Sequence, residues 1–397
     1  MISRIQNTLT RVSLASCLIA AEMVSSALAE PRVPRNDSEV LEKITAAATK
    51  SRNTAPRHEA VWMDPNSAAT EARRLIDLAR AESNPRYLGR AQAVLANWWT
   101  STNLPTEIRL LRGTIRQSLH EFVPALDDLS AVTREEPSNA QAWLTLSTLY
   151  LVRGDWDAAR QAALRLVPLT SKLIAATAAT AIGSVNGQLS ESYEHLSKIL
   201  AEFGSGPPRV RVWSWTLLGE MAERLGKIPE AERHFGKAFA IGMEDGYLVG
   251  AYADFLLGQG RHPAVIEFLA TRPETDGSLL RLAIAHHRTD PRSPKAVEVR
   301  DRLTIRFNAA RARGDRVHQR EEARFCLEVL EQPDRALELA RENWNVQREP
   351  ADIKILLEAA LATGHSATMT QAQEWIASTG FHDPALDLSL KRHLARK

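Results

Sequence analysis

The 397-residue sequence contains only two cysteines, and one of them, Cys17, lies in its N-terminal segment. If that segment is removed, one thiol remains, and a single thiol cannot form an intramolecular disulfide. The fold must then be stabilised by packing alone. The remaining cysteine, Cys326, lies in a helical pattern, and we interpret it as a small buried apolar residue rather than a reactive thiol.

The sequence also lacks an excess of either charge. Lys and Arg total 50 against 48 for Asp and Glu, which gives a formal net charge of +2. Nucleic-acid-binding proteins usually carry a marked basic excess, so we expect no nucleic-acid partner. After the N-terminus no apolar run reaches the length of about 18 residues that a membrane span needs, so no transmembrane span is expected in the mature chain.

Motifs for catalysis and metal binding are missing as well. His58 and His120 are each followed by Glu, as in a zinc-protease helix, but neither has the second His four residues later. The adjacent His286 and His287 would point about 100° apart on a helix and form a poor chelate. We therefore expect no cofactor, no metal site and no enzymatic activity. An enzyme with an unrecognised site in residues 273–335 is the alternative.

The N-terminal segment has the pattern of a secretory signal. Arg4 and Arg11 precede a mostly apolar stretch at residues 12–21, and a small-x-small cleavage pattern ends at Ala29. The sequence therefore predicts a signal peptide over residues 1–29 and a periplasmic or secreted mature protein.

A second interpretation of this segment is a bacterial lipoprotein signal. Leu14, Ala15 and Ser16 precede Cys17, which would be lipidated and become the mature N-terminus. Only residues 12–16 would then separate Arg11 from the cysteine, which is shorter than the usual apolar region of about 7–15 residues. We favour soluble export over lipidation.

Residues 30–66 are rich in Pro, Arg, Asn, Asp and Ser and are interpreted as a loosely ordered linker with one short helix, residues 38–50. From about Asn66 onward, apolar residues recur at three- and four-residue spacing in segments of about 12–15 residues, separated by Gly, Pro, Asn or Asp. No alternating strand pattern appears. The sequence predicts an all-α fold.

The helical segments repeat at a fixed period. Ala91, Ala125 and Ala159 follow one another at a constant interval of about 34 residues, and the same interval separates Ala231 from Val265. Three further pairs keep this step, which are Gly113 and Ser147, Gly219 and Ala253, and Gly226 and Gly260. Because several independent columns share one period, the sequence predicts stacked two-helix units.

One copy of the repeat carries a family pattern. The segment Trp143-x-x-Leu146-Ser147-x-x-Tyr150, followed by Gly154 and Ala159, resembles a tetratricopeptide repeat, and a second copy begins at Trp215. The resemblance implies an α-α superhelix, a tetratricopeptide-repeat solenoid of about eight or nine helix pairs. We expect the solenoid over residues 67–272 and a divergent helical part continuing it over 273–397.

The divergent part includes a charged segment. Residues 294–314 are expected to form one long helix, and the stretch from Arg300 to Arg324 is rich in arginine. We interpret this stretch as a solvated face stabilised by ion pairs four residues apart, and an anionic partner such as lipid headgroups or polysaccharide is the weaker alternative.

The resemblance places ligands in a groove lined by the first helix of each pair. The residues that it assigns to this groove are Gln141, Thr148, Trp213, Glu220, Glu223, Arg224, Tyr247 and Asp254. Trp213 has two interpretations: an exposed aromatic of a binding surface, or a side chain packed on the preceding repeat.

These observations favour a non-enzymatic periplasmic scaffold that binds a peptide or partner protein, for example a cell-envelope membrane protein. The alternative within the same class is a lipid-anchored subunit of an envelope export or assembly complex.

Overall fold

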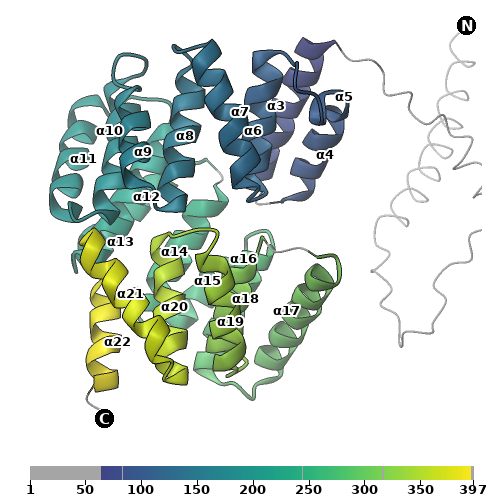
Figure 1. Cartoon of the computed structure of the whole chain (residues 1–397). Helices are drawn as coiled ribbons and strands as arrows, with labels where there is room; N and C mark the ends of the chain where they lie inside the picture. The colour runs from purple at the N-terminus through teal and green to yellow at the C-terminus, as the bar shows by residue number, and fades with distance from the viewer. Residues whose placement is uncertain (1–63, 83, 244, 315–316, 395–397) are drawn as a thin grey trace, which may run out of the picture. The chain divides into compact units, whose positions relative to one another are not determined.

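A computed structural model of the chain describes residues 64–82, 84–243, 245–314 and 317–394. The predicted signal peptide, the short helix at 38–50 and nearly all of the linker lie outside these residues. The described part is helical throughout and contains no strand (Figure 1). Its helices are α3 (Pro65–Ala81), α4 (Arg86–Val94), α5 (Ala96–Trp99), α6 (Thr106–Ser118), α7 (Phe122–Glu135), α8 (Ala140–Arg153), α9 (Trp156–Leu164), α10 (Lys172–Val185), α11 (Leu189–Phe203), α12 (Pro208–Arg224), α13 (Ile228–Phe239), α14 (Gly246–Gly258), α15 (His262–Ala270), α16 (Asp276–Thr289), α17 (Pro294–Ala312), α18 (Gln319–Glu328), α19 (Pro333–Trp344), α20 (Pro350–Thr363), α21 (Ser366–Thr379) and α22 (Pro384–Leu394).

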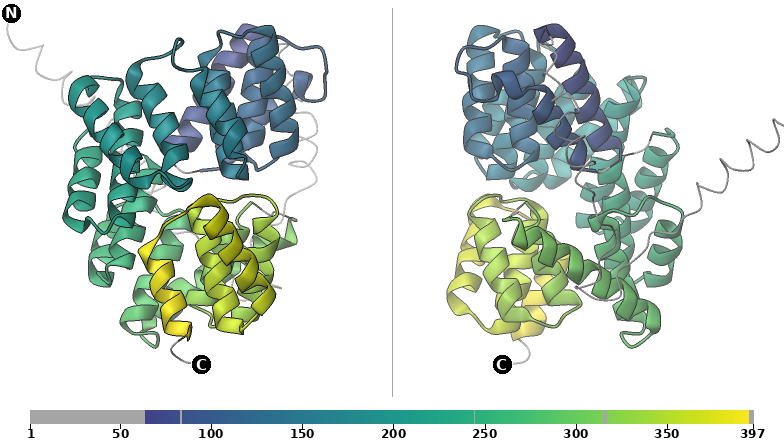
Figure 2. Two further views of the ribbon diagram at one scale, coloured as in Figure 1. Left: turned by 60° about the vertical axis from the view of Figure 1, so that its left-hand side comes forward. Right: turned by 90° about the vertical axis from the view of Figure 1, so that its right-hand side faces the viewer.

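The described helices form nine consecutive pairs (Figure 2). α3 pairs with α4, α6 with α7, and each even-numbered helix from α8 to α20 with its successor. The single turn α5 and the terminal helix α22 stand outside the pairing. First helices of successive pairs also pack on one another, as α12 does on α14 and α14 on α16. The expectation of eight or nine helix pairs is confirmed.

Small residues occupy the positions where the two helices of a pair cross. Ala91, Ala125 and Ala159, spaced by one period, are fully buried. A Cβ atom on Gly113 would lie 3.0 Å from Leu129 Cγ, and one on Gly219 would lie 2.8 Å from a ring carbon of Phe235. Since real Cβ contacts are almost never that short, the crossing excludes larger side chains. The periodic columns of the sequence are therefore columns of close helix contact.

Glycine also forms the turn inside several pairs. Gly154, Gly187, Gly226 and Gly260 each follow a first helix and have φ between 69° and 74°. This left-handed conformation is unfavourable for residues with a Cβ, and a single residue that adopts it ends the helix. Gly187 belongs to the divergent copy between Ala159 and Ala231, which keeps the same turn.

The apolar core continues across the expected boundary at residue 273. One buried cluster extends from Val212 in α12 to Val329 after α18 and includes Leu269 and Leu279 on either side of that boundary. α17 forms the predicted long helix, from Pro294 to Ala312. The described residues form one compact unit.

The C-terminal helices also contact turns near the middle of the chain, which the sequence did not predict. The Arg348 backbone N–H donates to the Val152 carbonyl over 2.7 Å. Trp156 at the start of α9 lies against Trp375 in α21, with ring centroids 6.1 Å apart. Leu151, Trp156 and Val185 belong to the same apolar cluster as α18–α22. Residues that are far apart in the sequence thus share one core.

Candidate functional site

All eight predicted groove residues lie on first helices of pairs. Gln141 and Thr148 are on α8, Tyr247 and Asp254 are on α14, and the other four are on α12. We call the surface formed by α12, α14, α16, α18 and α20 the first-helix face, because these helices pack in that order. The structure places Glu220, Glu223, Tyr247 and Asp254 on this face.

Tyr247 is the most exposed aromatic side chain of the predicted set, with 63% of its surface accessible. Its hydroxyl group donates a 2.6 Å hydrogen bond to Glu220 Oε1 on the preceding first helix. Loss of hydration raises the pKa of Glu220 to about 7, although the bond from Tyr247 and the charge of Arg224 act in the opposite direction. The pair therefore presents an aromatic ring beside a carboxyl group that titrates near neutrality.

Glu223 lies one turn further along α12 and forms no ion pair within the described residues. Burial raises its pKa to about 7, Lys354 on α20 lowers it, and the nearby Glu220 raises it further. The ionised form of Glu223 is therefore unfavourable in the free protein. A hydrogen-bond donor or a positive charge from a partner would stabilise it.

Asp254 is neutralised by arginines from the next two first helices. Arg281 on α16 donates to Asp254 Oδ2, and Arg324 on α18 donates to Oδ1 over 2.6 Å. Burial opposes ionisation of Asp254, but the two guanidinium groups outweigh it and hold its pKa below the ordinary value. Asp254 therefore joins three helix pairs and is less available to a ligand than Glu223.

The arginine network continues along the same face. Arg324 Nε donates to Glu328 over 2.6 Å, and Arg288 donates to the other oxygen of Glu328 at the same distance. Arg320 donates to Glu349 over 2.8 Å and lies 3.4 Å from Asp352. The expected pairs four residues apart occur at two positions of the arginine-rich stretch, Arg302–Glu298 and Arg324–Glu328. Arg320 and Arg324 in addition bind carboxylates of other helix pairs.

Two members of the predicted set are engaged in packing. Arg224 is 9% exposed, and its guanidinium group donates to the Ser184 carbonyl over 2.7 Å and lies over the Phe381 ring at 5.7 Å. Trp213 is half-buried against the cluster that contains Ala159 and Leu166. The packing interpretation accounts for Trp213, and Arg224 joins α12 to α10 and the C-terminal helices.

The two residues on α8 form bonds within their own helix. Gln141 Nε2 donates to the Thr145 hydroxyl over 3.1 Å, and the Thr148 hydroxyl donates to the Leu144 carbonyl. The structure does not bring them into contact with Glu220, Glu223 or Tyr247.

The geometry now described is that of stacked two-helix units, with small residues at several crossings and a left-handed glycine after several of the first helices. The described residues form an α-α superhelix of helix pairs that resemble tetratricopeptide repeats. Solenoids of this kind expose an extended surface that commonly mediates protein–protein interaction.

No family model matches the chain, and no curated protein matches it. Similar solved structures include pilF of Pseudomonas aeruginosa, at 15% identity, with 51% of this chain and 92% of that chain covered and a TM-score of 0.38. A tetratricopeptide repeat protein from Parabacteroides merdae has 13% identity, coverage of 74% and 99%, and a TM-score of 0.38. The APC/C hetero-tetramer Cut9-Hcn1 has 13% identity, coverage of 84% and 64%, and a TM-score of 0.49. Because these scores are low, the repeat assignment rests on the helix pairs themselves.

The region 273–335, where an enzymatic site was the alternative, contains a cavity of about 300 Å³ between α17 and α18. Arg311, Glu322, Cys326 and Arg335 are among its lining residues, and no His lines it. Burial raises the pKa of the Cys326 thiol to about 11. A protonated, buried thiol is a poor nucleophile.

Across the described ranges, no group of three or more His, Cys, Asp or Glu is arranged to hold a metal ion. None of the described helices combines the length and the apolarity needed to cross a membrane.

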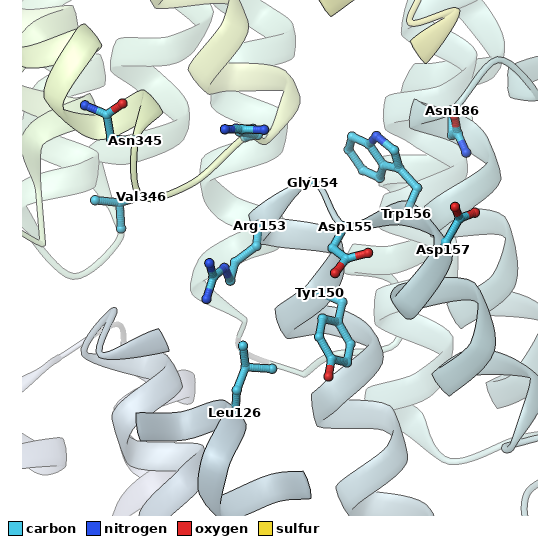
Figure 3. A pocket seen from close by; sticks show the side chains of 11 residues that line it. Leu126, Tyr150, Arg153, Gly154, Asp155, Trp156, Asp157, Asn186, Asn345 and Val346 are labelled. Carbon is cyan, nitrogen blue, oxygen red and sulfur yellow. The ribbon is translucent and has the colours of Figure 1, made fainter. Parts of the chain in front are cut away.

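A larger cavity, of about 650 Å³, is lined by none of the eight predicted groove residues (Figure 3). The turn between α8 and α9 forms one wall and the loop between α19 and α20 forms another. Because the two walls are far apart in sequence, periodicity gave no signal for it.

Proposed function

We propose that this protein is a non-enzymatic interaction scaffold, and that its first-helix face binds a peptide or a partner protein. The carrying observation is Tyr247, an aromatic side chain that is 63% exposed and is held by Glu220. Exposed aromatics beside charged groups have the composition of interface hot spots. Glu223, which forms no ion pair within the described residues, adds a position where a basic or hydrogen-bond-donating group of the partner would be stabilised.

Site-specific photo-crosslinking tests this proposal. A photoreactive phenylalanine analogue replaces Tyr247 in one variant and Ile305, a 67% exposed residue on the second helix α17, in a matched control. We expect a discrete crosslinked partner at position 247 and none at position 305 when the chain is expressed in its native cells. Equal products at both positions, or none at position 247, would show that this face is not the binding surface.

We further propose that the scaffold acts in the periplasm or outside the cell. The support is the basic N-terminus, the apolar stretch at residues 12–21 and the cleavage pattern ending at Ala29. Mass spectrometry of the mature N-terminus tests this directly. A chain beginning at Glu30 supports soluble export, a lipidated N-terminus at Cys17 supports the membrane-anchored alternative, and an unprocessed Met1 contradicts both.

A further inference from the structure

The 650 Å³ cavity has a size suited to a small organic ligand. Arg153, at the end of α8, and Arg348, in the loop before α20, both line it. Figure 3 shows the labelled Arg153 side chain at the end of α8, on the side where Leu126 lies, with Asp155 in the turn that follows. The walls are joined directly by the hydrogen bond between the Arg348 N–H and the Val152 carbonyl.

The two arginines differ from the others near the cavity because neither has an acidic partner. Within the residues that the structure describes, no carboxylate forms an ion pair with Arg153 or Arg348. The two acids of the cavity are already engaged: Asp155 caps α9 by accepting from the Ala158 N–H over 3.2 Å, and Asp157 accepts from Arg160 over 2.9 Å. Neither guanidinium group therefore forms an ion pair with the two acids that line the same cavity.

Arg348 is held in position by its own surroundings. Its guanidinium group lies over the Trp344 ring at 5.8 Å. Its stem packs on Gly154, where an added Cβ atom would lie 3.1 Å from Arg348 Cδ. A side chain fixed in this way loses less conformational entropy when it binds a ligand.

The cavity lining is mostly polar, but it includes four side chains that offer apolar or aromatic surface. These are Leu126, Tyr150, Trp156 and Val346. An aromatic or aliphatic part of a ligand would be removed from water there, which is favourable in proportion to the area buried.

We propose that this cavity binds a small carboxylic acid with an apolar or aromatic part. Arg153 and Arg348 donate to the carboxylate, because the planar guanidinium group matches that geometry. Asp155 and Asp157 nearby make a second negative charge on the ligand unfavourable, so a monoanion is preferred to a dianion such as phosphate.

Binding of four probes to the full chain tests the proposal: 3-phenylpropanoate, its neutral amide, phenyl phosphate and inorganic phosphate, at matched ionic strength. Tryptophan fluorescence, with Trp156 in the cavity wall, and thermal denaturation report binding. We expect saturable binding of the carboxylate, at least about tenfold weaker binding of the amide, and weaker binding of both phosphates.

Variants locate the site. Arg153→Gln and Arg348→Gln should each weaken 3-phenylpropanoate binding about tenfold, because each removes one charge-assisted bond. Arg134→Gln, which removes an exposed arginine without an ion pair in the described part of the chain, should leave affinity unchanged within about twofold. Circular dichroism checks that each variant is folded, and Arg153→Lys gives a conservative replacement that keeps the charge.

Three outcomes would overturn the assignment. The first is equal affinity for the carboxylate and the amide. The second is an equal loss in Arg134→Gln and Arg153→Gln, which would reflect net charge alone. The third is no saturable binding of 3-phenylpropanoate up to about 10 mM, a concentration at which even a very weak specific site is occupied. Tighter binding of phenyl phosphate would overturn the preference for a monoanion.

Discussion

The contact between Gly187 and Gly380 gives the sharpest prediction about the fold. Gly187 lies in the turn after α10, and Gly380 ends α21, with φ of 74° and 65°. A Cβ atom on Gly380 would lie 3.0 Å from Gly187 Cα, which is backbone and has no side chain to move aside. In Gly380→Ala, the left-handed conformation costs about 1–2 kcal/mol and the close contact about 1–3 kcal/mol more, so we expect a loss of about 2–5 kcal/mol in the free energy of unfolding.

A second glycine separates the two contributions. Gly364 ends α20 in the same conformation, with φ of 69°, but nothing lies within 4 Å of its ideal Cβ position. Gly364→Ala should therefore cost only the conformational part, about 1–2 kcal/mol. Urea unfolding followed by tryptophan fluorescence measures both losses, and hydrogen exchange in α21 and α22 shows whether this end opens locally. Equal losses in the two variants would refute the contact as a source of stability.

Three further predictions concern buried charge and the thiol. Arg112→Met removes the 2.6 and 2.9 Å bonds to buried Asp128, which keeps its 2.7 Å bond from Arg116, and the bonds to three backbone carbonyls, so stability should fall by about 2–4 kcal/mol in urea; a loss under about 1 kcal/mol would contradict this. Burial raises the pKa of Glu220 and Glu223 to about 7 from an ordinary value of 4.5, so the folded chain binds more protons than the unfolded chain in that interval. Stability should therefore fall as pH rises from about 4.5 to about 7, and the double variant Glu220→Gln/Glu223→Gln should reduce this slope; an unchanged slope would exclude these two groups as its source. Native Cys326 should resist iodoacetamide at pH 8 and react in urea, as followed by peptide mass spectrometry; rapid native labelling would show that the thiol is accessible.

The repeat could be predicted from the sequence because its determinants are local. Ala125 and Ala159 are small for the same reason: each lies where two neighbouring helices cross, and one period separates them. Gly154 and Gly226 follow first helices in a conformation that favours glycine. Each constraint acts within one helix pair, so a single chain shows it several times.

The period identifies the helix and the face on which a residue lies, and in the structure Tyr247 on α14 bonds Glu220 on α12. The period does not show which side chains are covered by residues of other repeats. Arg224 is covered because Ser184 and Phe381 approach it from other repeats, and neither contact has a local signal.

The arginine-rich stretch also carries a signal at the repeat interval. Arg320 on α18 lies 3.4 Å from Asp352 on α20, 32 residues later. This separation is close to one repeat, because the first helices of successive pairs are neighbours in the solenoid. Opposite charges about one period apart therefore predict inter-repeat ion pairs, whereas a search at four residues favours pairs within one helix.

The contacts between the middle of the chain and its C-terminal helices follow the repeat as well. Gly154 contacts Arg348 and Gly187 contacts Gly380, and the interval along the chain is close to one repeat on both sides. Successive turns on one side thus meet successive loops on the other, one repeat at a time. Each helix pair is rotated by a small angle relative to the one before it, and these angles add up along the solenoid. A small change in each angle would therefore move the two sides apart. The periodicity of the sequence predicts the repeat but not the total rotation. The cavity between Arg153 and Arg348 forms because the total rotation brings the turn after α8 next to the loop before α20.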